Sequence, residues 1–143
     1  MHTRNLITRS LLLSSVALCC GDDGGPANGN TEPITTGVWH GNAGTGFAFD
    51  FTINAARDAV TSVTFQWTDW KCGTSAATHS GGITSNRDPG WAITNRAIAI
   101  DADPADLTFT ITGTVANNGT EASGTWNGTD VGGTCSGTWT AAP

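Results

Sequence analysis

Residues 107–115 have the sequence LTFTITGTV, in which threonine occupies every second position from 108 to 114 and the residues between are mostly apolar. A similar alternation occurs at 47–53, FAFDFTI, and at 63–67, VTFQW. A period of two places one set of side chains on a core and the other in water, as in antiparallel sheets. Threonine, valine, isoleucine and the aromatic residues are also the residues that strands favour. These segments predict an all-β domain.

Turn signals rich in glycine, proline and asparagine separate the alternating segments. Asn118-Gly119 and Gly132-Gly133 suit tight hairpins, and RDPG at 87–90 is a further turn signal. The short connections favour neighbours that run up and down, so we predict a small antiparallel meander of eight or nine strands, either a barrel or a two-sheet sandwich. The expected strands are 36–42, 46–54, 60–69, 77–84, 90–94, 96–101, 106–116, 120–128 and 134–141.

A Gly-x-Trp motif occurs three times, ending at Trp39, Trp126 and Trp139. Residues two apart share one face of a strand, and a glycine there leaves space that a large ring of a neighbouring strand can cover. We expect these faces to point inward, with Cys135 and Gly137 on the same face as Trp139.

The N-terminus has the layout of a secretory signal. Arg4 and Arg9 precede an apolar run at 11–18, which is shorter than the ~20 residues that cross a bilayer. The run ends at Cys19-Cys20, which resembles the lipid attachment point of bacterial lipoproteins, with Cys20 preferred over Cys19. We therefore predict a signal segment at 1–19 and a mature protein that is attached to a membrane through a lipid anchor. Simple secretion is the alternative.

The next residues, 20–36, are rich in Gly, Asp, Asn and Pro and nearly free of apolar side chains. Such a segment buries too little surface to offset its ordering entropy. It predicts a flexible tether of roughly 20–25 Å average span, followed by the β domain at 37–143.

The exported chain is acidic. Without residues 1–19 it keeps four basic and twelve acidic residues, a net charge of −8. Four scattered basic residues do not form the basic patch that nucleic acid requires, and they do not favour binding to anionic lipid headgroups. We expect no nucleic-acid partner.

Cys72 and Cys135 are the cysteines of the predicted domain. Two cysteines in an exported domain usually form a disulfide. The alternative, a metal site, lacks further Cys or His ligands close by in the sequence. We predict a Cys72–Cys135 disulfide and no metal or other cofactor.

The last strands resemble a type of small secreted β domain found in bacteria. The resemblance lies in ITGTV at 111–115, EASGTW at 121–126 and CSGTWTA at 135–141, together with the opening Gly-x-Trp strand and the mid-chain Cys72. It covers 37–141 and implies the fold and the disulfide, but no activity. The opening strand is also similar to the start of avidin-like and lipocalin-like barrels, which hold small ligands, although this chain has no tyrosine.

The residues that could carry enzymatic chemistry are few. His40 alternates with Trp39 and should face solvent, and His79 lies in a polar loop. No Gly-x-Ser-x-Gly elbow accompanies either histidine. Asp50, Asp69 and Glu121 are candidate carboxylates for glycoside hydrolysis, but their spacing singles out no pair.

Two other groups are candidate ligand sites. Asp101, Asp103 and Asp106 could bind calcium through oxygen atoms, although three acids in a turn more often serve turn formation and solubility. Trp70 has the opposite phase to the apolar face of its strand, and Trp91 follows Pro89-Gly90. Exposed tryptophans could stack on a sugar or anchor a protein; the alternative is that both cap the ends of the core.

Three functional hypotheses remain open. The first is a non-enzymatic binding or interaction domain on the bacterial cell envelope, with a glycan or protein partner. The second is a small-ligand-binding barrel, which requires a deep apolar cavity. The third is a small secreted hydrolase whose site the sequence does not reveal.

Overall fold

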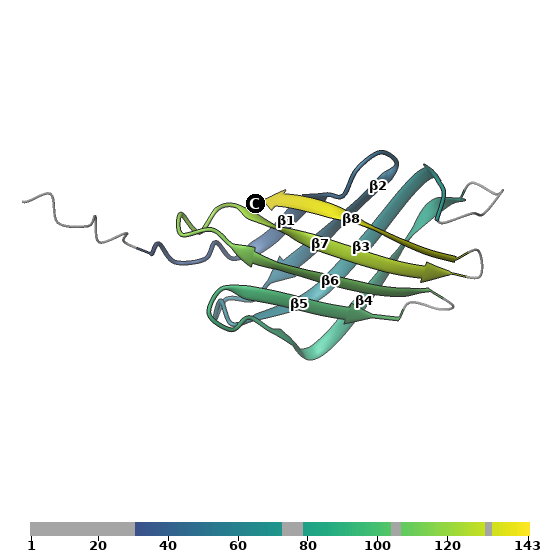
Figure 1. The fold of residues 1–143 in the computed structure, drawn as a ribbon. Coiled ribbons are helices and arrows are strands. Elements are labelled where there is room, and N and C mark those ends of the chain that lie inside the picture. The colour runs from purple at the N-terminus through teal and green to yellow at the C-terminus, as the bar shows by residue number, and fades with distance from the viewer. Residues whose placement is uncertain (1–30, 73–78, 104–106, 131–132) are drawn as a thin grey trace, which may run out of the picture.

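The computed structural model describes residues 31–72, 79–103, 107–130 and 133–143, and within them the chain forms strands and no helix (Figure 1). All eight strands pair with antiparallel neighbours, which confirms the all-β prediction. The predicted signal segment and lipid-attachment cysteines Cys19 and Cys20 lie outside the described residues. The strands are β1 (Gly37–Asn42), β2 (Phe47–Ile53), β3 (Ala59–Trp70), β4 (His79–Ala92), β5 (Ala97–Ala102), β6 (Thr108–Val115), β7 (Ala122–Asp130) and β8 (Gly133–Ala142).

The strands form one nearly closed, barrel-like sheet in the order β4-β3-β2-β1-β8-β7-β6-β5. The first and last strands pair with each other, His40 opposite Ala142, and this pairing joins the two halves of the meander. In Figure 1, β5 to β8 cross the front of the molecule while β1 to β4 run behind them at an angle. The sheet remains open between its two end strands, β4 and β5.

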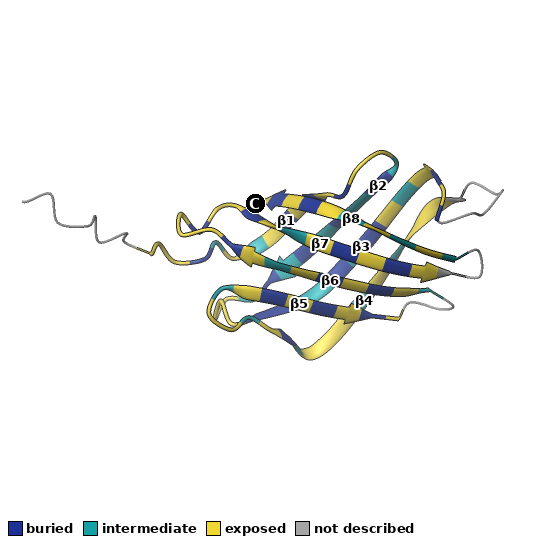
Figure 2. Cartoon of the chain, in the orientation of Figure 1, coloured by how far each residue is buried: buried dark blue, intermediate teal, exposed yellow. Residues whose placement is uncertain are grey.

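Aromatic rings fill the interior between the two halves. Phe47 has its ring centroid 4.6 Å from that of Trp126, 5.3 Å from that of Trp70 and 5.5 Å from that of Phe109. Phe49 and Phe51 are also buried, as the alternation predicts, and Figure 2 shows the same alternation of buried and exposed residues along the strands. The interior of an eight-stranded barrel is either filled by side chains or holds one small ligand, and here the aromatic rings fill it.

The Gly-x-Trp faces point inward, as expected. Trp126 and Trp139 are buried, and Gly137 pairs with Trp126 across β7 and β8. A Cβ atom at Gly137 would lie 2.8 Å from Nε1 of Trp126, too close for a real contact. The glycine is therefore required because the neighbouring indole lies over it.

The meander has eight strands, the lower of the two predicted numbers, because two of the expected segments merge into one strand. Residues 77–84 and 90–94 were expected as two strands with a turn at 87–90, but β4 runs through that turn. The register passes from Ser62 opposite Asn86 to Val60 opposite Trp91, so the four residues between form a bulge. Gly90 adopts φ +122° within it, which explains how a turn-like sequence fits inside a strand.

The last residues of the predicted tether pack on the domain. Ile34 is buried, the backbone N–H of Glu32 donates to the carbonyl of Asn117 at 2.8 Å, and Arg57 Nε donates to the carbonyl of Ile34 at 2.9 Å. Arg96 Nη1 also donates to the carbonyl of Glu32, at 3.0 Å. One isoleucine and two arginines therefore fix a segment whose composition predicts a coil.

Candidate functional site

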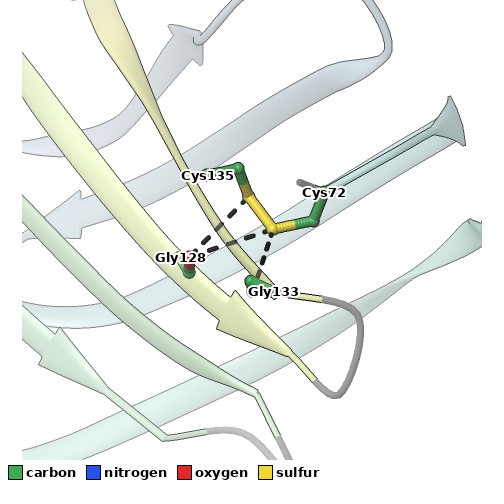
Figure 3. Close-up of a disulfide and its surroundings, with 4 residues drawn as sticks. All are labelled: Cys72, Gly128, Gly133 and Cys135. Carbon is green, nitrogen blue, oxygen red and sulfur yellow. Dashed lines mark hydrogen bonds between the residues drawn. A yellow bond between two sulfur atoms is a disulfide. The ribbon is translucent and has the colours of Figure 1, made fainter. Parts of the chain in front are cut away.

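The predicted disulfide is present. Cys72 follows β3 and Cys135 lies in β8, with a Cα–Cα distance of 5.2 Å and a sequence separation of 63 residues (Figure 3). The strand order places β2 and β1 between β3 and β8, so the bond links the two halves of the barrel. Both sulfur atoms lie near the carbonyl oxygen of Gly128 in β7. The cysteines serve the fold, and a metal site built on their thiolates is excluded.

The two tryptophans expected as ligand contacts are buried instead. Trp70 is 8% exposed and Trp91 is 5% exposed. The register between β3 and β4 is broken after Trp67, where Asp69 adopts φ +49°, and the break returns Trp70 to the inner face. Both rings therefore cap the core, and neither is available to stack on a sugar.

Trp91 has a structural partner at the open seam of the barrel. Its Nε1 donates to the carbonyl oxygen of Asp101 in β5 at 2.9 Å, and Arg87 Nη1 donates to Oδ1 of Asp101 at 2.8 Å. These contacts hold β4 to β5 where no continuous ladder does.

The same contacts engage Asp101, one of the three expected calcium ligands. Of the other two, Asp103 is exposed and Asp106 lies outside the described residues. The described residues contain no group of three or more metal-binding side chains.

His40 faces solvent as predicted and lies in a surface groove of about 520 Å³. Its Nδ1 is 3.0 Å from Oδ1 of Asp50 on the neighbouring strand β2. The groove is also lined by Asn42 of β1, by Glu121 just before β7, by Ser123 of β7, and by residues 140–142 of β8. A histidine oriented by a carboxylate in a groove is the arrangement from which a hydrolase would be built.

The strand register keeps a nucleophile away from His40. Ser123 pairs with Thr140, which pairs with Asn42, so Ser123 is two strands from β1 and two residues out of line with His40. Two strand steps span roughly 10 Å, whereas a serine and its base must approach to ~3 Å. Ser123 therefore cannot form a hydrogen bond with the imidazole in this arrangement.

The candidate carboxylates are also separated. Asp50 lies in β2 and Glu121 precedes β7, three strand steps away or roughly 14 Å. Paired carboxylates in glycosidases are about 5–9.5 Å apart. Asp69 is exposed at the far end of β3, and the side chain of His79 lies outside the described residues. The geometry therefore brings Asp50 and Glu121 into no carboxylate pair of the kind that glycosidases use.

Among the described residues, the outer side of β6, β7 and β8 forms a regular surface. Its four cross-strand rows are each three residues wide, and all twelve side chains are exposed and carry a hydroxyl or an amide. We call this surface the threonine face. It consists of Thr108, Thr110, Thr112 and Thr114 of β6, Ser123, Thr125, Asn127 and Thr129 of β7, and Thr134, Ser136, Thr138 and Thr140 of β8.

Buried indole groups support the threonine face from below. Trp139 Nε1 lies 3.1 Å from the carbonyl oxygens of both Thr112 and Thr125, beneath the row that these two residues form with Thr138. The hydroxyls of Thr112 and Thr125 are 3.1 Å apart. Threonine is β-branched and has few rotamers, so the array is stiff in both its backbone and its side chains.

Sequence reasoning missed the threonine face as a site. The outward threonines of 108–114 are plain in the sequence, but alternation alone identifies them only as a solvated side. The alignment of three such segments into rows depends on the strand order β8-β7-β6 and its register.

The chain matches no known protein-family model, no curated protein and no solved structure. The resemblances to small secreted bacterial β domains and to avidin-like barrels therefore stay predictions. Within the described part of the chain, no helix has the length and apolar character to span a membrane.

Proposed function

We propose that this chain is an exported protein, anchored in the bacterial cell envelope by a lipid on Cys20 or Cys19, whose β domain is a non-enzymatic binding module. The observation that carries the proposal is the threonine face: twelve exposed, uncharged, hydrogen-bonding side chains in register on a stiff support. Its partner is an extended, uncharged surface that offers hydrogen bonds.

The rest of the described surface favours a polar partner over an apolar one. Val38 is the one large hydrophobic side chain of the described residues that is strongly exposed. Five of the six tryptophans are buried, and Trp67 is partly buried against the core. A partner recognised by hydrophobic anchors or aromatic stacking would lack its contacts here.

Two other hypotheses have less support. A ligand-carrying barrel needs an apolar cavity, but Phe47, Phe65 and Phe109 stack in the interior with ring centroids 4.5–6.3 Å apart. A hydrolase needs a nucleophile beside His40, and the register keeps Ser123 away from it.

Co-sedimentation of the mature chain with insoluble, uncharged surfaces tests the binding module. The mature chain begins at residue 20 and retains every residue that the structure describes. We expect it to bind at least one neutral surface among cellulose, chitin and ice, and Thr125→Lys to abolish that binding. Gln66→Lys, an exposed position on β3, adds the same charge elsewhere and should leave binding intact. Equal binding by both variants would remove the threonine face from the proposal.

Labelling cells with a radioactive fatty acid tests the anchor. We expect label on the protein and its recovery with membranes, both lost in Cys20→Ala and retained in Cys19→Ala. Loss only in Cys19→Ala would transfer the anchor to that residue. An unlabelled protein in the soluble fraction would contradict lipid attachment.

A further inference from the structure

We propose that the threonine face binds ice. This inference rests on the proposed binding module and names its ligand as the ordered water lattice of an ice crystal. It depends on the two-dimensional repeat of the face, on its lack of charge and on its stiffness.

The repeat of the threonine face is set by sheet geometry. Neighbouring strands lie about 4.8 Å apart, and successive outward residues on one strand lie about 6.7 Å apart. Four complete rows follow from the pairing, with Thr112, Thr125 and Thr138 in one and Thr114, Ser123 and Thr140 in the next. The oxygen lattice of ice also repeats in two directions, at lengths of the same order, so neighbouring rows near the centre of the face can meet lattice positions together.

The charge of the threonine face suits ice and disfavours most other partners. The whole chain has a formal net charge of −6, yet none of the twelve residues is charged. The nearest charged side chain on β5, Asp101, pairs with Thr110 at the border and is engaged by Arg87. An ionic partner would find no opposite charge within the face, whereas a neutral lattice requires none.

A dissolved ligand would gain little from this face. Each hydroxyl bond to a solute replaces a bond to water, so its net contribution is only about 0.5–1.5 kcal/mol. The middle of the face offers no aromatic platform and no ion pair, and the His40 groove touches it only at Ser123 and Thr140. A solid lattice differs because it engages all rows at once, and one binding event then gains from many weak contacts.

Threonine can contact ice through both its hydroxyl and its methyl group. Its hydroxyl can continue the hydrogen bonding of the lattice, and its methyl group gains by removal from liquid water. Nine of the twelve positions are threonine. Since a threonine has few rotamers and the indole of Trp139 holds the backbone of Thr112 and Thr125, little order has to be created on binding.

The test is the effect of the purified mature chain, with Cys20→Ser to avoid lipid, on ice. We expect it to give small ice crystals flat facets and to stop their growth at temperatures just below the melting point. We also expect it to be incorporated into ice that grows slowly. Thr125→Lys, at the centre of the face, should abolish all three effects. Gln66→Lys should retain them, although it changes the charge equally. Thr138→Lys repeats the test on β8 in case Thr125→Lys impairs folding, which circular dichroism and Tm would reveal.

The possible outcomes distinguish failure of the ice inference from failure of the binding module. Absence of ice activity in the unsubstituted chain, or equal activity in Thr125→Lys and Gln66→Lys, overturns the ice inference. If ice is not bound but cellulose or chitin is, and Thr125→Lys abolishes that binding, the inference fails while the binding module stands. If no surface is bound at all, both fail.

Discussion

Gly137 of β8 lacks a Cβ atom, and this leaves room for the indole of Trp126 on the neighbouring strand β7. A Cβ atom there would lie 2.8 Å from Nε1 and 3.1 Å from Cε2 of Trp126, whose Nε1 is 3.3 Å from the carbonyl of Ala43. We expect Gly137→Ala to displace the indole and to lower the free energy of unfolding by about 1–3 kcal/mol. Urea denaturation measures this difference. Ser136→Ala, the exposed neighbour, should change it by less than about 0.5 kcal/mol. Equal effects would mean that the indole does not need the space.

Ile34 contributes stability from outside the strands. It is 8% exposed, and its carbonyl accepts a hydrogen bond from Arg57 Nε. We expect Ile34→Ala to destabilise the domain by about 2 kcal/mol, since it removes a buried side chain that closes one end of the barrel. Thr36→Ala, at an exposed position two residues later, is the matched control in thermal unfolding. An unchanged Tm for Ile34→Ala would mean that residues 31–36 belong to the flexible tether and do not stabilise the domain.

Among the elements, β4 and β5 are held together mostly by side chains. Trp91→Phe removes the Nε1 donor to the carbonyl of Asp101 and part of a buried ring, so we expect a loss of about 2 kcal/mol and faster amide exchange along β5. Arg87→Met removes a solvent-exposed ion pair to Asp101 and a cation–π contact with Trp91, whose ring centroid is 5.7 Å from the guanidinium carbon, and should cost about 1 kcal/mol. Hydrogen exchange on both variants compares the two contacts. A larger effect of Arg87→Met would show that the contacts of Arg87, and not the Nε1 hydrogen bond of Trp91, hold the seam.

Much of the fold is readable from the sequence because period-two alternation is a local signal. The segments 47–53 and 107–115 show it without interruption and became β2 and β6. The errors occur where geometry breaks the alternation. Residues 87–90 resemble a turn but form a bulge inside β4, and Asp69 at φ +49° reverses the phase that would have exposed Trp70.

The candidate site was less accessible to sequence reasoning because it depends on how elements neighbour one another. His40 and Asp50 are ten residues apart in the chain and meet only because β1 pairs with β2. The threonine face likewise requires β8 to lie beside β7, with Thr138 opposite Thr125. Register is set by the pairing of whole strands, so a single strand's sequence does not reveal its rows.

For the molecule as a whole, two contacts at opposite ends bind the halves of the barrel. Ile34, Arg57 and Arg96 join the N-terminal segment to the turns at one end, and the Cys72–Cys135 bond joins β3 to β8 at the other. Strand pairing connects the halves between β1 and β8, whereas β4 and β5 are held together mostly by side chains. The disulfide therefore restrains a connection that hydrogen bonds make incompletely.

Removing the disulfide should reveal how much stability that restraint provides. The bond closes a segment of 63 residues, for which loop-closure entropy predicts about 4 kcal/mol. We expect Cys72→Ala/Cys135→Ala to lower the free energy of unfolding by about that amount, measured in urea without reductant. A reductant should lower the Tm of the unsubstituted chain and leave that of the double variant unchanged, because only the former has a bond to break. Thr125 and Trp139 are three and four residues along their strands from Gly128 and Cys135, so binding at the centre of the threonine face should persist in the double variant at temperatures where it is folded. Loss of that binding in a folded double variant would mean that the disulfide also sets the geometry of the face.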